Sequence, residues 1–463
     1  MAAGSQPAGA ATAAYSVYTI TSTGGDCAVS GNGWGAWDAY TNTCTLRADI
    51  AMYGANGIDI NADNVTLDGN GHSLIGNNIT NTNGVYLSGR TGVTVKNLTV
   101  EHFYHGIDLA SSSGNALAGN NASLNNSSGI YLTGSSNNVL NSNTANSNSS
   151  YANSGNAAGI ELESSSNGNT LSGNTADNTN GGNWMQTMYV AGIWLGSSSN
   201  NRLTNNTVIN SQGSNLSWFD VAGFFLMSAS NNILSGNTAS IPGYNGYGES
   251  IGLWLTSSAN GNTLLGNTSS NNQVAIYLNS CSNSQIYHNS FLNSSLKQAQ
   301  VYGGSGNLFN LAAPTGGNYW SNWTTPDSDN DGFVDNPYVF SGGQDNLPLS
   351  APVASGKPNL TLDLPSPFWA SLSDYQSGQL SVTWTVNNTG ANEAWSAQLT
   401  GSRNTAGVTL ATTLPASIGG GDILAGASGS ATLKYNVPAG VGAWVSTLTG
   451  SAQDGMGAGY SYP

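Results

Sequence analysis

The chain is short of charge, and positive charge is the scarcest. Only 7% of its 463 residues are charged, and eight Lys and Arg stand against 23 Asp and Glu, giving a net charge of −15. Nucleic-acid binding needs clustered cations, so we expect no nucleic-acid partner. Anionic polymers would be repelled in the same way unless a cation bridged them.

Long apolar runs are also missing. No apolar run is long enough to span a membrane, so we expect no membrane span. Residues 1–14 have neither the basic start nor the apolar stretch of an intact signal peptide, and we expect a flexible N-terminal segment there.

Cysteine is rare, with three residues in the chain. Cys27 and Cys44 lie close together near the start, and we predict a disulfide between them; two free buried thiols are the alternative. A disulfide indicates an oxidising, extracellular or cell-surface location. Cys281 falls in a turn of the repeat described below and is expected to be buried.

What the chain has in abundance is Gly, Ser, Thr and Asn, arranged as a repeat. The stretch Gly129-Ile130-Tyr131-Leu132 recurs in variant form about every 22 to 23 residues where no insertion intervenes, and such a period predicts a solenoid. The leading position of the other repeats is occupied by Gly57, Gly84, Gly106, Gly159, Gly192, Gly223, Gly252 and Ala275.

Each repeat predicts one rung of a coil. Alternate side chains of a strand share a face, so Ile130 and Leu132 point inward and Tyr131 points outward. One rung cannot bury its apolar pair alone, and stacking supplies the core. Asn residues recur at two fixed turn positions and could bond to one another along the axis. We predict an all-β fold, a right-handed parallel β-helix, with the hand taken from the chirality rule for β connections.

The opening Gly57-Ile58-Asp59-Ile60 through Asp68-Gly69-Asn70-Gly71-His72 resembles NosD-like β-helix proteins of the copper-maturation type and the wider carbohydrate-binding and sugar-hydrolase β-helix group. The closing segment Gly316-Gly317-Asn318-Tyr319-Trp320 with its Asp-rich loop resembles the end of NosD-like surface proteins. The resemblance covers about residues 40–350. It implies the fold, whereas the group's functions range over lyases, epimerases, transport accessories and surface proteins.

The outward positions of the repeat form one row rich in aromatic rings, which could stack on sugars or fill a protein interface. Alternatively, insertions fold over the row and bury it. The row comprises Asp59, Tyr86, Asp108, Tyr131, Glu161, Trp194, Phe225, Trp254 and Tyr277.

Four consecutive insertions should leave the coil at one corner and form a wall beside this row. They span about 145–158, 176–191, 208–222 and 239–251. Their large side chains include Tyr151, Trp184, Met185, Met188, Tyr189, Trp218, Phe219, Tyr244 and Tyr247.

The row also holds the candidate enzymatic residues. Asp108 and Glu161 stand two rungs apart with Tyr131 between them, a spacing open to an inverting hydrolase. No Lys or Arg in the row could serve as a lyase base. His102 and His105 could hold a metal, with a hydrogen-bonded turn as the alternative.

A loop near residue 330 has the Asp spacing of a Ca²⁺ site. Asp327, Asp329, Asp331 and Asp335 would bind by side chain and Phe333 by its carbonyl, although Tyr338 replaces the closing Glu of an EF-hand. Ca²⁺ is the expected cofactor; a solvated Asp and Asn turn is the alternative.

The period ends after Lys357-Pro358, and sandwich-like strand signals follow. Trp384-Thr385-Val386-Asn387-Asn388-Thr389-Gly390 resembles the strand and turn of CARDB-like Ig-type adhesion domains, which act as spacers or adhesive modules. We expect a flexible segment at 1–14, a cap at 15–56, the β-helix at 57–311, the Asp-rich loop and linker at 312–356 and an Ig-like β-sandwich at 357–463.

Asn-x-Ser/Thr sequons are frequent in so Asn-rich a chain. We expect glycosylation, where the source can perform it, among Asn78, Asn97, Asn126, Asn148, Asn215, Asn293, Asn322, Asn359 and Asn387.

Together these features favour an extracellular structural or adhesive surface protein, a surface-layer or filament component that self-associates or binds other surface proteins through its aromatic row. The competing hypothesis is a protein that binds or cleaves glycans.

Overall fold

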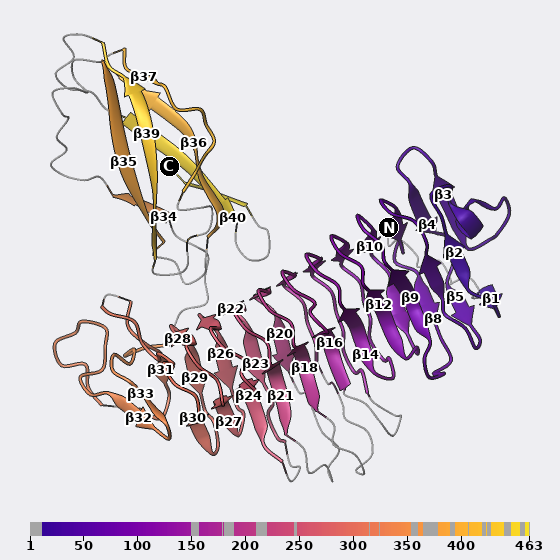
Figure 1. The fold of residues 1–463 in the computed structure, drawn as a ribbon, viewed down its shortest axis with the longest axis horizontal. Helices are drawn as coiled ribbons and strands as arrows, with labels where there is room; N and C mark the ends of the chain where they lie inside the picture. Colours follow the sequence, from indigo (N-terminus) through magenta and orange to yellow (C-terminus); the bar gives the residue numbers. More distant parts are fainter. Residues whose placement is uncertain are drawn as a thin grey trace, which may run out of the picture. The chain divides into compact units, whose positions relative to one another are not determined.

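The computed structural model contains a β-coil and a separate β-sheet unit (Figure 1). The first unit comprises residues 1–311 and 317–351, and the second residues 312–316 and 352–463. The structure describes residues 12–149, 157–177, 179, 189–209, 220–244, 248–313, 315–323, 325–352, 360–363, 378–388, 394–405, 407–418, 423, 427–438, 446–453 and 459–462.

The coil is built of short parallel strands stacked rung on rung into three sheets. The first sheet contains, in spatial order, β2 (Tyr18–Ile20), β6 (Ile58–Ile60), β9 (Asn83–Ser88), β12 (His105–Ala110), β14 (Ser128–Thr133), β16 (Ala157–Glu163), β18 (Val190–Gly196), β21 (Val221–Met227), β24 (Ser250–Thr256), β27 (Val274–Asn279) and β30 (Lys297–Tyr302). Every pairing in this sheet is parallel, as the repeat predicts.

The second sheet is parallel apart from its opening hairpin of β3 and β4. It contains β3 (Gly35–Asp38), β4 (Thr43–Leu46), β7 (Thr66–Asp68), β10 (Thr94–Lys96), β13 (Ala116–Ala118), β15 (Val139–Asn141), β17 (Thr170–Ser172), β19 (Arg202–Thr204), β22 (Ile233–Ser235), β25 (Thr263–Leu265) and β28 (Gln285–Tyr287).

The third sheet is interrupted in the middle of the coil, where single bridges replace full strands. Its first part contains β1 (Thr12–Ala14), β5 (Ile50–Met52), β8 (Ser73–Ile75) and β11 (Thr99–Glu101), and its second part β20 (Thr207–Ile209), β23 (Thr238–Ser240), β26 (Thr268–Ser270), β29 (Ser290–Leu292) and β31 (Tyr319–Trp320).

The core fills the inside of the coil with the apolar pairs that the repeat predicts. Ile130 and Leu132 are fully buried, and the equivalent residues of neighbouring rungs stack on them. The leading glycines stack at one inner corner. A Cβ at Gly106 would lie 2.6 Å from the carbonyl oxygen of Gly129, so this close approach requires glycine.

Two ladders of buried asparagines hold the rungs together, which confirms the axial bonding expected from the sequence. In the longer ladder each side-chain Nδ2–H donates to the Oδ1 of the next asparagine at 2.9–3.0 Å. Backbone N–H groups share the same acceptors. The longer ladder consists of Asn120, Asn143, Asn174, Asn206, Asn237, Asn267, Asn289 and Asn318, and the shorter of Asn115, Asn138, Asn169, Asn201, Asn232 and Asn262.

The longer ladder ends on a buried carboxylate that the sequence analysis did not identify. Asp345, in β33 (Gly343–Asp345), accepts hydrogen bonds through Oδ2 from the backbone N–H of Asn318 at 2.7 Å and from Nε1–H of Trp320 at 2.9 Å. Its Oδ1 accepts from the backbone N–H of Leu347 at 3.1 Å. Burial nevertheless raises the pKa of Asp345 to about 6.

The N-terminal end is closed by the short helix η1 (Gly25–Ala28) and the β3–β4 hairpin. A disulfide joins Cys27 to Cys44, which confirms the predicted pairing, and Cys281 is buried as expected. β1 pairs in parallel with β5, so Thr12–Ala14, expected to be part of a flexible segment, is a strand of its own coil.

At the other end, aromatic rings close the core. Trp320 stacks on Phe291 and on Tyr338 with ring centroids 4.5 and 4.6 Å apart, and Tyr338 begins β32 (Tyr338–Phe340), which pairs with β33. The closing signature Gly316–Tyr338 therefore covers the last rung.

The second unit contains two four-stranded antiparallel sheets, compatible with the predicted β-sandwich. Buried Trp384, Leu399 and Leu433 belong to its core. One sheet contains β34 (Leu360–Asp363), β35 (Gln379–Asn388), β39 (Ser428–Asn436) and β37 (Thr409–Leu410), and the other β38 (Ala416–Ser417), β36 (Trp395–Asn404), β40 (Ser446–Gln453) and β41 (Gly459–Tyr462).

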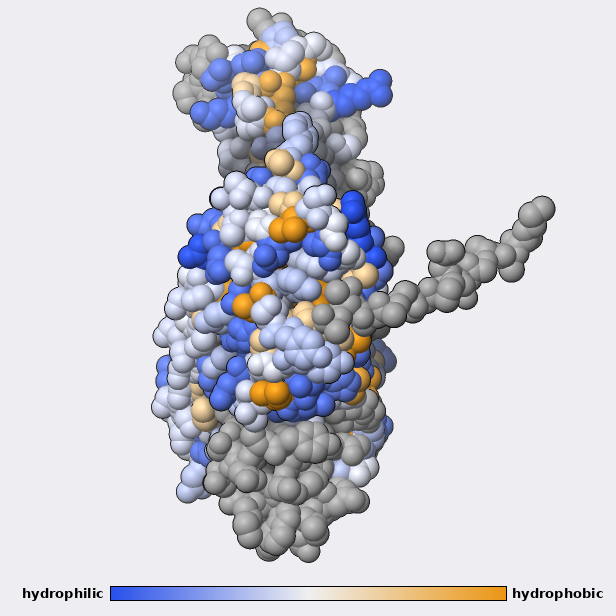
Figure 2. Space-filling model, turned by 90° about the vertical axis from the view of Figure 1, so that its right-hand side faces the viewer, coloured by the Kyte–Doolittle hydropathy of each residue, from blue (hydrophilic) through white to orange (hydrophobic). Residues whose placement is uncertain are grey.

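The surface agrees with the composition. In the view of Figure 2 the described surface is largely hydrophilic, with apolar residues in isolated spots. In the part of the chain that the structure describes, no helix has the length and apolar character needed to cross a bilayer.

Candidate functional site

The predicted outward row exists, and its members lie directly opposite one another on the first sheet. The parallel register pairs Asp59 with Tyr86, Tyr86 with Asp108, Asp108 with Tyr131 and Tyr131 with Glu161. It continues from Glu161 through Trp194, Phe225, Trp254 and Tyr277. The first half of the row is rich in carboxyl groups and the second half in rings.

The prediction that the ring-bearing half is exposed was wrong. Trp194, Phe225 and Trp254 are only 1%, 0% and 7% exposed. They form a second apolar cluster on the outside of the sheet, because small and branched residues of the same strands pack beside them and Tyr189 packs on their faces and edges. Tyr86, Tyr131 and Tyr277 remain half-buried.

Tyr189 is the end of the second predicted insertion, so this residue fits the alternative in which insertions cover the row. Trp184 and Trp218, together with Tyr151, Met185, Met188, Phe219 and Tyr247, lie outside the described residues. Each of the four insertions leads into a strand of the first sheet, namely β16, β18, β21 and β24.

Asp108 is the first buried carboxyl group of the row. It lies on β12 with 7% of its surface exposed. The Nδ2–H of Asn83 donates to its Oδ2 at 2.8 Å, while its Oδ1 has no hydrogen-bond partner among the described residues. Burial raises the pKa of Asp108 to about 7, against the opposing effect of Asn83.

Glu161 is the second buried carboxyl group, on β16, with 4% of its surface exposed. Ser128 Oγ–H donates to its Oε2. Burial, followed by the nearby carboxylate of Glu163, raises the pKa of Glu161 to about 8. Glu163 in turn accepts a hydrogen bond from the hydroxyl of Tyr131 at 3.3 Å.

Two rings separate and flank these carboxyl groups. Tyr131 occupies the strand between Asp108 and Glu161. The ring of His105 stacks on Tyr131 with centroids 4.5 Å apart and planes at 10°. Burial lowers the pKa of His105 to about 4, so its imidazole is neutral at physiological pH.

The two histidines of the predicted metal turn have different surroundings. His105 is half-buried and stacks on Tyr131, whereas His102 adopts a left-handed backbone with φ of 63°. Within the described ranges, the group of three side chains placed to share a metal ion is made of aspartates elsewhere in the chain.

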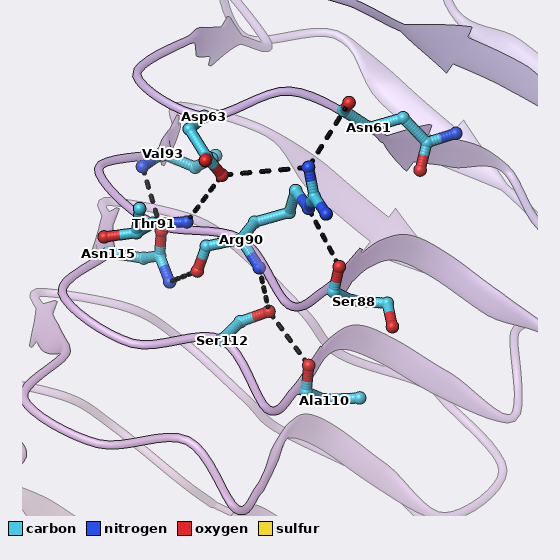
Figure 3. A network of polar contacts seen from close by, with 9 residues as sticks. All are labelled: Asn61, Asp63, Ser88, Arg90, Thr91, Val93, Ala110, Ser112 and Asn115. Atoms are coloured by element: carbon cyan, nitrogen blue, oxygen red, sulfur yellow. Dashed lines mark hydrogen bonds and ion pairs between the residues drawn. The ribbon is translucent and has the colours of Figure 1, made fainter.

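The coil's cations are engaged away from the row. Figure 3 shows Arg90 at a corner of the coil, where its Nε–H donates to the carbonyl of Ser88 at 2.8 Å and its guanidinium lies 3.8 Å from Asp63. Lys96 pairs with Asp68 at 3.2 Å on the second sheet. Neither is placed to act as a base beside Asp108 or Glu161.

The Asp-rich loop brings three of its five predicted ligands together. Ligand atoms of Asp327, Asp329 and Asp335 lie within 4.8 Å of one another. The carboxylate of Asp331 instead accepts the backbone N–H of Phe333 at 2.9 Å. Carboxylate oxygens are donors that suit Ca²⁺, and hydrogen bonds from Ser328 lower the pKa of Asp335.

The sequons differ in accessibility. Asn78, Asn97, Asn293 and Asn322 are exposed, and Asn126 and Asn387 are half-buried. Asn148 is fully buried and accepts the backbone N–H of Asn125 at 2.9 Å, so its amide has no room for a glycan and that prediction was wrong. Asn215 and Asn359 lie outside the described residues.

Two family models match the coil. One describes a right-handed β-helix region and matches residues 56–239, and the other describes the periplasmic copper-binding protein NosD and matches residues 175–325. Copper sites favour His, Cys and Met ligands, and the three-residue ligand cluster in the described part of the chain is all aspartate. This donor set does not suit copper.

A comparison with curated protein sequences finds no significant match. Among solved structures, the chain resembles the Dettilon tailspike protein at 13% identity, covering 91% of this chain and 86% of that chain with a TM-score of 0.48. An alginate lyase from a Paenibacillus species matches at 14% identity over 63% of this chain and 97% of that chain, with a TM-score of 0.37.

Likenesses at this level carry no information on substrate or activity. The hand of the coil, taken from general chirality in the sequence analysis, agrees with the matched family description. The coil is thus a right-handed parallel β-helix, similar in sequence to the NosD family over residues 175–325.

Proposed function

We propose that this protein is an extracellular glycan hydrolase that holds a sugar chain against the outer face of the first sheet. The observation that carries the proposal is the pair Asp108 and Glu161, two buried carboxyl groups with raised pKa values on one row of the sheet. Pairs of carboxyl groups tuned in this way are typical of glycoside hydrolysis.

Glu161 is the proton donor in this mechanism, because a pKa of about 8 keeps it protonated at neutral pH. It transfers its proton to the glycosidic oxygen as the bond to the anomeric carbon breaks. Asp108, with a pKa of about 7, is the base when ionised and takes a proton from the water that attacks that carbon.

The spacing is too long for a retaining pair and lies near the upper limit for an inverting one. Asp108 and Glu161 lie two strands apart, which corresponds to roughly 9.6 Å between backbones at the usual strand spacing. Inverting enzymes hold their carboxyl groups about 6.5–9.5 Å apart so that a water molecule fits on the far side of the sugar ring.

The neighbours assist the proton transfer. After Glu161 has lost its proton, the hydroxyl of Ser128 stabilises the carboxylate that remains. Tyr131, between the two carboxyl groups, offers a half-buried ring on which a sugar could stack. For the Asp-rich loop we propose Ca²⁺ bound by Asp327, Asp329 and Asp335, with a structural role at the end of the coil.

The second candidate is the adhesive or self-assembling surface protein. Its main support was an exposed aromatic row, and the burial of Trp194, Phe225 and Trp254 removes most of that surface. Two features still favour it: the asparagine ladders make the coil rigid, and Tyr86 and Tyr277 are only half-buried. Electron microscopy of the purified protein would test it, with filaments or sheets as the supporting result.

The hydrolase proposal is tested by measuring reducing ends released from a panel of polysaccharides. We expect Glu161→Gln and Asp108→Asn each to lower the rate by about 100-fold or more. Glu101→Gln, which changes a carboxylate on the third sheet, is the matched control and should retain wild-type activity. Activity of Glu161→Gln equal to that of the wild type would overturn the proposal.

A further inference from the structure

The outer face of the first sheet is acidic along both the row and its neighbouring edge. Asp59, Asp108 and Glu161 belong to the row, and Glu163 lies beside it. Burial, and after it the nearby charges of Asp220 and Glu249 at the edge where the insertions enter, raises the pKa of Tyr277. A sugar on this face therefore meets carboxyl groups from several strands.

The described strands around the two central carboxyl groups contain no Lys or Arg. Besides the engaged Arg90 and Lys96, the coil contains Arg47 in the N-terminal cap, Arg202 on β19 of the second sheet and Lys297 on β30. Lys297 is on the first sheet, but β30 is five strands from β16, about 24 Å at the usual strand spacing.

The insertions add no cation either, and this follows from the sequence alone. Segments 150–156, 180–188, 210–219 and 245–247 contain neither Lys nor Arg. The remaining basic residues, Lys357, Arg403 and Lys434, follow the coil in the chain. The described strands β12, β14 and β16 thus offer a substrate carboxylate over Asp108 or Glu161 no guanidinium or ammonium partner.

A bound divalent cation could in principle replace the missing basic residues. Among the described residues, however, the acidic cluster with converging ligand atoms is that of Asp327, Asp329 and Asp335, in the loop that follows the coil. Asp108, Glu161 and Glu163 do not form such a cluster. The described residues of this face therefore provide no set of three converging ligands for a bridging ion.

The groups that do lack partners suit hydroxyls. Oδ1 of Asp108 and Nε1–H of Trp194 are buried and have no hydrogen-bond partner among the described residues. Gly196 is buried beside them, and a Cβ there would lie 3.1 Å from the indole Nε1 of Trp194 and 3.4 Å from the carboxylate of Glu163, so a side chain at this position would crowd both groups. A sugar hydroxyl can both donate to a carboxylate and accept from an indole.

Resting on the proposed function, we infer that the outer face takes a neutral glycan rich in free hydroxyl groups and rejects polyuronates such as alginate and pectate. The carboxylates along this face, Glu163 among them, supply repulsion against a uronate, and the unpartnered Oδ1 of Asp108 and Nε1–H of Trp194 supply partners for hydroxyls. The repulsion between carboxylates thus contributes to the preference for neutral glycans over polyuronates as much as the hydrogen bonds to hydroxyl groups do.

The test compares polymers that differ only in charge. Binding of the full chain to polygalacturonate and alginate is measured at pH 7.5 and low salt, against the same polymers after reduction of their carboxyl groups to alcohols. Linkage and length are then matched. We expect binding to at least one reduced polymer to be about 100-fold tighter than to its parent uronate, with 1 mM Ca²⁺ making no difference.

Each other outcome has a separate meaning. Equal or tighter binding to the uronate, or uronate binding that appears with Ca²⁺, overturns the inference and leaves the proposed function standing. Tighter binding to the cationic polymer chitosan than to any neutral glycan also overturns it, because simple charge attraction would then decide. Failure to bind any polymer of a wide neutral and charged panel overturns the proposed function itself.

Discussion

Removing one amide from the middle of the longer asparagine ladder should destabilise the whole coil. Asn206 is fully buried, and its Oδ1 accepts the backbone N–H and the Nδ2–H of Asn174 at 3.0 and 2.9 Å. Its own Nδ2–H groups donate to the carbonyl of Leu171 and to Oδ1 of Asn237, both at 2.9 Å. The variant Asn206→Ala loses all four hydrogen bonds.

The expected loss is about 5–7 kcal/mol, taking roughly 1 kcal/mol for each of the four bonds and a further 1–3 kcal/mol for the N–H of Asn174 left buried without an acceptor. Because each rung contacts only its neighbours, the damage should be greatest in the rungs beside Asn206. Urea unfolding followed by circular dichroism measures the total, and hydrogen exchange locates it.

Asn279→Ala is the matched control. Asn279 is half-buried, and among the described contacts its side chain accepts one hydrogen bond, from Ser280 Oγ at 3.1 Å. We expect a change within about 0.5 kcal/mol for such a site. Equal losses for Asn206→Ala and Asn279→Ala would refute the idea that the ladder stabilises the coil.

Three further outcomes are expected. Burial raises the folded-state pKa values of Asp345, Asp108 and Glu161 to about 6, 7 and 8. The stability that these protonated groups contribute is therefore fully present below pH 4 and is lost as pH rises from 5 to 9. The denaturation midpoint should fall over that range, and a flat profile would contradict this. Hydrolysis should show a bell-shaped pH dependence with its maximum between about pH 7 and 8, and a maximum near pH 5 would exclude the assigned roles. Millimolar Ca²⁺ should raise the melting temperature of the wild type and not of Asp327→Asn, and an equal shift in both would remove the Ca²⁺ proposal.

The repeat made the fold predictable, because periodic signals report on stacking. The alternation in Ile130-Tyr131-Leu132 gave the inward and outward faces, and the register then placed Asp108 and Glu161 on one row. The fixed offsets of the asparagines predicted their ladders. A feature that recurs in every rung appears many times in the sequence, and this repetition makes it predictable.

Features that occur once were missed or misjudged. Alternation shows that Trp194 faces out of the sheet but not whether Tyr189 will cover it. Asp345 is not part of the repeat, so no periodic pattern predicts its position, although it ends the longer asparagine ladder by accepting the backbone N–H of Asn318. The raised pKa of Glu161 depends on its burial and on Glu163 two residues away. The repeat spacing does not show which residues on the outer face of the sheet are buried, nor how close two carboxylates lie.

The glycine column at the inner corner has a consequence for how such a chain can change in length. A Cβ at Gly106 would lie 2.6 Å from the carbonyl oxygen of Gly129, and one at Gly223 would lie 2.7 Å from that of Gly252. A gene duplication that copies one whole turn would bring its own glycine and amide, and both new junctions would fit. A side chain within the column would meet this close approach, and only the last leading position, Ala275, departs from glycine. Growth or loss by complete turns avoids the problem, so relatives of this protein should differ by integral numbers of coils.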